Sequence, residues 1–61
     1  MESKQQFLRL TGVEGQDTLI NISHIVCVQE HEKGSAVHSA DDGSIIVIET
    51  PEQIMNGIME A

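Results

Sequence analysis

Short stretches of the chain alternate between apolar and polar residues, and a period of two is typical of β-strands. This pattern, together with two continuous apolar runs, predicts five strands, at residues 5–11, 18–22, 25–28, 35–40 and 44–49. In the first of them Leu8 and Leu10 share one face, while Phe7 and Arg9 lie on the other. The residues between the first two segments are polar and flanked by glycine, so we expect a turn there and a hairpin formed by these two strands.

The remaining connections differ in how sharply they are specified. Residues 21–24, Asn-Ile-Ser-His, favour a kink or a single helical turn, because short polar side chains can satisfy nearby backbone groups. Residues 29–34 are polar and end in glycine, which indicates a solvated connection. Asp42-Gly43 predicts a tight hairpin turn, because this pair accepts positive φ angles.

Two strands are notable for their apolar content. Ile-Val-Cys-Val at 25–28 is apolar without a break, which predicts a strand covered on both faces and a buried, structural Cys27. Residues 44–49 contain Ile-Ile-Val-Ile, the most hydrophobic and β-prone run of the chain. We therefore expect this last strand to lie in the centre of the sheet.

The C-terminal segment has the signals of a helix. Thr50 is a candidate N-cap, Pro51 suits the first helical position, and Gln53 completes a Thr-x-x-Gln capping box. Apolar residues then recur at helical spacing, at Ile54, Met55, Ile58 and Met59. Together the elements predict an α+β fold that is mostly β: a strongly bent antiparallel sheet of four to five short strands with one C-terminal amphipathic helix.

The size of the chain limits both its stability and its chemistry. With 61 residues and a mass of 6.7 kDa, residues 1–61 are expected to form one domain, too small to enclose the deep pocket of a self-contained enzyme. Such domains usually need extra support, and the single Cys27 cannot form an internal disulfide, so we expect a homo-oligomer. The candidate interface consists of Ile45, Val47, Ile54, Ile58 and Met59.

Charge restricts the possible partners. The formal net charge is −7, which argues against direct binding of nucleic acid or of an anionic membrane surface. No apolar run approaches the roughly 20 residues of a membrane span, and one lone thiol suits a reducing compartment, so we expect a cytoplasmic protein. Four acidic residues are expected to gather at one end of the sheet, as a solvated rim or as a patch for a basic partner: Glu30, Glu32, Asp41 and Asp42.

The residue types that carry chemistry do not form a recognisable motif. His24, His31 and His38 are equally spaced, but they fall on a kink, a loop and a strand, so we expect no metal site. The Asp-Asp-Gly turn lacks the further oxygen ligands of a calcium loop, and the glycines match no phosphate loop. We therefore expect no cofactor and no catalytic residue.

The order of the segments resembles that of a known family. Phe-Leu-x-Leu-Thr, then Leu-Ile-Asn, His-Ile-x-x-Val, Asp-Gly and Val-Ile-Glu-Thr before a helix are similar to the small FlbD-like proteins of flagellar and swarming gene neighbourhoods, which also occur in phages. A looser similarity links the chain to the β-rich core of LytTR-type domains, but the basic residues for phosphate contacts are missing. The resemblance covers residues 7–59 and brings no catalytic residues.

Composition and resemblance together favour a non-enzymatic binding or adaptor protein that acts as a homo-oligomer through protein–protein contacts. The alternative is a small acidic inhibitor, of phage origin, that mimics nucleic acid, occupies a basic site on a host protein or sequesters a charged ligand. An enzyme is the third class. The lack of Trp and Tyr leaves Ile and Met to form any interface.

Overall fold

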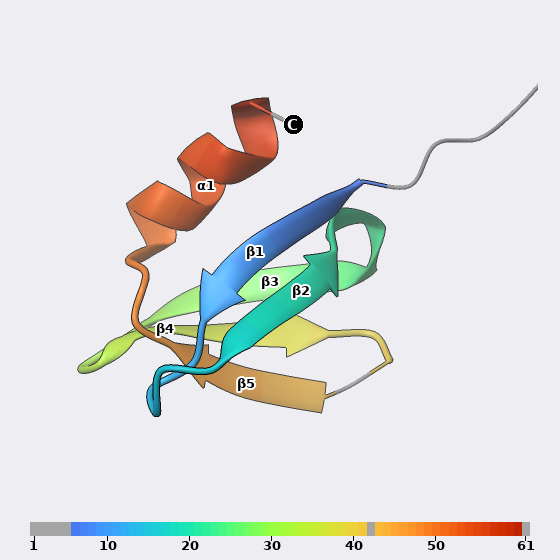
Figure 1. Ribbon diagram of the computed structural model, residues 1–61. Coiled ribbons are helices and arrows are strands. Elements are labelled where there is room, and N and C mark those ends of the chain that lie inside the picture. The colour runs from blue at the N-terminus through green and yellow to red at the C-terminus, as the bar shows by residue number, and fades with distance from the viewer. Residues whose placement is uncertain (1–5, 42, 61) are drawn as a thin grey trace, which may run out of the picture.

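The chain folds as a mostly β, α+β protein with two antiparallel sheets and one C-terminal helix, which confirms the predicted fold class (Figure 1). The computed structural model describes residues 6–41 and 43–60. Its elements are β1 (Phe7–Thr11), β2 (Asp17–Asn21), the 3-10 turn η1 (Ile22–His24), β3 (Ile25–His31), β4 (Gly34–Ser39), β5 (Gly43–Val47) and α1 (Pro51–Glu60). Residue 5, where the first strand was expected to start, lies outside the described residues.

Two sheets meet at one junction. β1 and β2 form a hairpin, while β3, β4 and β5 form a three-stranded sheet in that order. The end of β1 reaches the end of β5, where Gly12 bridges to Val47 and the Ile48 N–H donates to the Thr11 C=O at 2.9 Å. The strands therefore follow one another in the spatial order β2, β1, β5, β4, β3, and β2 and β3 lie at the two ends.

The hydrophobic core lies between the hairpin, the three-stranded sheet and the helix. Its buried members come from four strands and from α1: Leu10, Ile20, Val37, Val47 and Ile54. Figure 1 shows the β1–β2 hairpin crossing the three-stranded sheet, with α1 beside β1. Five half-buried apolar residues pack around this centre: Leu8, Ile25, Val28, Ile45 and Ile58.

β4 is the central strand of the three-stranded sheet, where the Ile-rich strand β5 forms an edge, but the bridge to β1 places β5 in the middle of the five-strand order, as expected. Small residues line the contact between the start of β4 and the end of β5. Gly34 has a φ of 146°, and a Cβ at this position would lie 2.3 Å from the Val47 carbonyl oxygen. Ser35 is fully buried and its hydroxyl donates to the Glu49 C=O at 2.7 Å. These residues let β5 approach β4 closely, which bulkier side chains would prevent.

β3 also departs from its prediction. The strand continues through His31, beyond the expected end at residue 28, because the solvent-exposed face of an edge strand accepts polar residues. Cys27 is exposed and Val26 is 68% exposed, so neither the doubly covered strand nor the buried thiol is correct. The pairing with β4 shifts register between Ile25 and Cys27, which indicates a β-bulge that turns Val26 outward.

The helix begins as the sequence predicts, but it buries only half of its apolar stripe. The Thr50 N–H donates to Gln53 Oε1 at 2.9 Å and the Gln53 N–H donates to Thr50 Oγ1 at 3.2 Å, which is a capping box. Ile54 is fully buried, whereas Met59 is 75% exposed. Residues four apart share a side, and each methionine lies about 100° further round the helix than the isoleucine before it. The methionines therefore face outward.

Candidate protein-binding surfaces

The residues expected to form an oligomer interface belong mainly to the core. Val47 and Ile54 are fully buried, while Ile45 and Ile58 are half-buried and pack against the core. Met59 is the exposed member of the set. A buried core and a buried interface have the same hydrophobic pattern in a sequence, so the pattern could not separate them. The exposed apolar residues lie on two other surfaces.

The first surface is the outer side of the β1–β2 hairpin, called here the hairpin face. Its members point away from the core: Phe7, Arg9 and Thr11 of β1, and Asp17, Leu19 and Asn21 of β2. Phe7 is 54% exposed and Leu19 is 61% exposed. Register places Leu19 directly opposite Arg9, and the inner side of the same hairpin holds Leu10 and Ile20 of the core.

The second surface is a flank of α1 formed by Met55 and Met59, called here the methionine flank. Both side chains are more than half exposed, and their spacing of four places them one above the other. Another part of the helix contacts β1, because a Cβ at Gly57 would lie 2.7 Å from Leu8 Cδ1. Flexible methionine side chains suit adaptable protein contacts.

The acidic residues do not gather at one place. Glu30 and Glu32 lie at the β3–β4 turn, whereas Asp41 lies at the β4–β5 turn. These turns are at opposite ends of β4, about 17 Å apart for a six-residue strand. Asp42 lies outside the described residues. The structure therefore does not bring Glu30 and Glu32 together with Asp41 in one patch.

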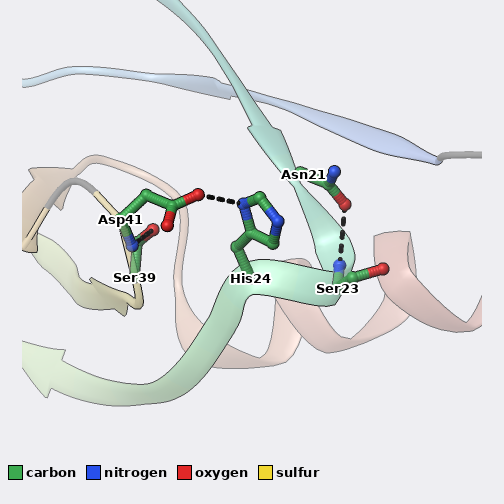
Figure 2. A network of polar contacts seen from close by, with 5 residues as sticks. All are labelled: Asn21, Ser23, His24, Ser39 and Asp41. Atoms are coloured by element: carbon green, nitrogen blue, oxygen red, sulfur yellow. Dashed lines mark hydrogen bonds and ion pairs between the residues drawn. The ribbon is translucent and has the colours of Figure 1, made fainter.

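A small polar network connects η1 to the β4–β5 turn (Figure 2). Asn21 caps the turn, because its Oδ1 accepts the Ser23 N–H at 3.0 Å. His24 Nδ1 lies 2.6 Å from Asp41 Oδ2, and the Asp41 N–H donates to Ser39 Oγ at 3.3 Å. The predicted helical turn at 21–24 is thus confirmed, and its histidine contacts Asp41 in the turn that follows β4.

A second histidine has both ring nitrogens in hydrogen bonds. His38 Nδ1 lies 2.6 Å from Ser44 Oγ, and its Nε2 lies 3.0 Å from Gln29 Oε1. One ring nitrogen contacts the Ser44 hydroxyl and the other contacts the Gln29 amide oxygen, so the imidazole joins these two side chains. The network crosses all three strands on the exposed side of the sheet, with Cys27 opposite His38 in register. It links the strands on this exposed face.

The described residues contain no enclosed chemistry-bearing site. No pocket is found in the described part of the chain, and no three His, Cys, Asp or Glu side chains of residues 6–41 and 43–60 could hold one metal ion. No helix in the same residues is long and apolar enough to cross a membrane. Any binding site of the described residues therefore has to be sought on their exposed surface.

Phe7 and Leu19, the exposed apolar residues of the hairpin face, were not singled out by the sequence pattern. The signal was present for Phe7, which alternation placed opposite to Leu8 and Leu10. For Leu19 the signal depends on the hairpin register, because only the pairing with Arg9 shows which side of β2 is outside.

Comparison with known proteins adds no relative. No family model, no curated protein and no solved structure matches the chain. The resemblance to FlbD-like proteins therefore stays a prediction, and function has to be argued from the surfaces.

Proposed function

We propose that this chain is a non-enzymatic, cytoplasmic binding or adaptor protein of the FlbD-like type that acts as a homo-oligomer through protein–protein contacts. One observation carries the proposal. Among the described residues, the large apolar side chains left exposed outnumber the hydrophobic residues that are buried. The exposed ones are Phe7, Val13, Leu19, Val26, Ile48, Met55 and Met59.

The arrangement of these side chains supports binding more than their number does. Isolated apolar residues are ordinary on protein surfaces, whereas grouped ones mark interaction sites. Phe7 and Leu19 share the hairpin face, and Met55 and Met59 share the methionine flank. Each square ångström of apolar surface that a partner removes from water contributes about 25 cal/mol. Two separate surfaces allow self-association on one and a further protein on the other, which is the arrangement an adaptor needs.

The size of the core supports self-association in particular. Five buried hydrophobic residues form the centre of the fold, and a domain of this size has little stability to spare. Any contact that binds only the folded chain adds to its stability. Burying exposed apolar residues between copies would supply that support without a disulfide or a metal.

Light scattering after size-exclusion chromatography tests the proposal. We expect a mass approaching at least twice 6.7 kDa as the concentration rises from about 10 µM to about 500 µM, the range in which micromolar association is visible. Detection must use refractive index, because the chain has no Trp and no Tyr. A mass of 6.7 kDa across the whole range would contradict the homo-oligomer.

A further inference from the structure

The free edge of β2 points to how two copies would meet, an inference that rests on the self-association proposed above. We propose that two copies of this chain pair along β2, antiparallel, about a twofold axis at Leu19. The two hairpins then form one continuous four-stranded sheet, with the hairpin faces side by side. Five observations, on pairing, backbone direction, register, charge and the other edge, lead to this arrangement.

β2 is a regular strand with a pairing partner on one side. Among the described residues it pairs with β1 alone, in unbroken register from Phe7 opposite Asn21 to Thr11 opposite Asp17. The structure shows no bulge in this strand. A regular edge presents backbone groups to a strand from another molecule.

The direction of the backbone groups follows from one hydrogen bond. The Ile22 N–H donates to the Gln6 C=O at 3.0 Å, so these two residues form a hydrogen-bonded pair. Hydrogen-bonded and non-hydrogen-bonded pairs alternate along an antiparallel ladder. Arg9 and Leu19 are opposed three steps further along, an odd number, and so form a non-hydrogen-bonded pair. The N–H and C=O of Leu19 therefore point away from β1, toward the free edge.

A twofold axis at Leu19 makes the register complementary. Leu19 then opposes Leu19 of the second copy, and Asp17 opposes Asn21 of the second copy. Several registers would place outward-pointing residues of the two β2 strands opposite each other. The register centred on Leu19 is the one in which all five residues of β2 have a partner in the second copy. It joins two exposed leucines across the new ladder, where side chains directly opposite contact each other, and it sets no two like charges opposite.

Charge makes this face suitable for a second copy of an acidic chain. The net charge is −7, so most surfaces of two copies repel each other. The hairpin face is an exception, because Arg9 and Asp17 leave it balanced. Arg9 is also beside Leu19 in register, so its positive charge lies close to the proposed axis. Two copies can thus approach here without opposing acidic residues.

The edge at the other end of the strand order is less suitable. β3 has the bulge at Val26, and Glu30 stands on the same strand. Bulges and charges are devices that keep an edge from pairing with another chain. β2 has no bulge, and its one charged residue is at its first position. The comparison favours β2 as the edge that pairs.

The test compares matched variants by light scattering. Leu19→Lys places two ammonium groups opposite each other at the axis and should shift the dimerisation midpoint at least tenfold upward in concentration. Val26→Lys is the control, because Val26 is an exposed apolar residue on β3 and makes the same change in net charge. Both variants lower the magnitude of the net charge, which alone would favour association. Far-UV circular dichroism confirms that each variant is folded.

A cross-linking experiment keeps the test decisive if Leu19→Lys fails to fold. In the proposed dimer the two residues at position 19 form a hydrogen-bonded pair, whose Cα atoms lie about 5.5 Å apart, within disulfide range. Leu19→Cys in a Cys27→Ser background should therefore form a disulfide-linked dimer under mild oxidation. A Val26→Cys chain in the same background should stay largely uncrosslinked.

Each outcome has a distinct meaning. Loss of association in Leu19→Lys with the control unaffected, or selective cross-linking at position 19, supports the β2 pairing. A Leu19→Lys variant that associates like the wild type, or equal cross-linking at positions 19 and 26, overturns the β2 pairing while self-association stands. A wild-type chain that stays at 6.7 kDa overturns both the pairing and the homo-oligomer.

Discussion

Glu49 shows how a single residue can join segments that are far apart in the chain. Its carboxylate accepts the Thr11 N–H, at 2.9 and 3.1 Å to the two oxygens. Its backbone C=O accepts the Ser35 hydroxyl at 2.7 Å. The residue thereby connects the end of β1, the end of β5 and the buried start of β4. This is the place where the hairpin is fastened to the three-stranded sheet.

Replacing Glu49 by Ala should lower the free energy of unfolding by about 1.5–3 kcal/mol, the usual worth of a hydrogen bond to a charged group. Glu49→Gln keeps an acceptor oxygen and should cost less. Denaturant titration followed by circular dichroism measures both, at one fixed protein concentration because the proposed association would add stability. Losses near zero in both variants would show that the bond from Thr11 contributes nothing to stability, and equal larger losses would show that a neutral amide oxygen cannot replace the carboxylate.

Single residues are also where sequence and structure differ most. Alternation correctly placed Phe7 and Arg9 opposite to Leu8 and Leu10, because side-chain direction in a strand follows directly from order. The exposure of Val26 and Cys27 could not be predicted, because it depends on a bulge and on the position of β3 at a sheet edge. An apolar run has the same appearance in either environment.

At the scale of elements, the start of α1 is determined by local sequence, whereas its orientation is determined by tertiary packing. Three residues determine where it starts, Thr50, Pro51 and Gln53, and their capping role needs no other part of the chain. Its orientation depends on packing, which buries Ile54 and leaves Met59 in solvent. A helix of ten residues is marginal alone in water, so burial against the strands must hold it.

Three substitutions in α1 should therefore differ in cost. Ile54→Ala should lower the free energy of unfolding by about 2–5 kcal/mol, because it leaves a cavity in the core. Thr50→Ala should cost about 1 kcal/mol through the lost cap. Met59→Ala should change stability by less than about 0.5 kcal/mol. Denaturant titration of the three in parallel checks the order, and a Met59 cost equal to that of Ile54 would contradict the orientation of the helix.

The β-strands likewise have features that depend on local sequence and features that depend on tertiary pairing. The antiparallel pairing of β1 with β2 and of β4 with β5 was predictable, because local turn signals join these strands. Asp42 of the second turn lies outside the described residues. The place of β4 between β3 and β5 was not predictable from hydrophobicity, because it depends on which strands pair with each other. Hydrophobicity marked β5 as the most apolar strand, and β5 is the strand that joins the three-stranded sheet to the end of β1.

At the scale of the whole molecule, two strands end the sheet order and differ in how they are protected. β3 has a bulge and β2 is regular. Apart from Met59, the interface residues expected from the sequence form the core or pack against it. The fold of one chain uses their apolar surface, so little of it is left for a second chain. The surface that we propose for association is the hairpin face, which could be found only from the strand register. Leu19 and Phe7 are exposed on it.

Five residues of ladder form a small interface, so we expect an equilibrium between one and two copies rather than a permanent dimer. Such an equilibrium lets the chain respond to its own concentration. In such an equilibrium the fraction of dimer changes with concentration, so a signal from Leu19 should change with concentration too.

Amide hydrogen exchange at Leu19 tests the central claim most directly. No described strand accepts this N–H, so in a single copy it should exchange fast, whereas the Ile22 N–H, bonded to Gln6, serves as a protected reference. We predict that Leu19 exchange slows markedly when the concentration rises from about 10 µM to about 500 µM, because a second β2 strand then accepts the bond. Fast Leu19 exchange at both concentrations, with Ile22 protected at both, would contradict the account.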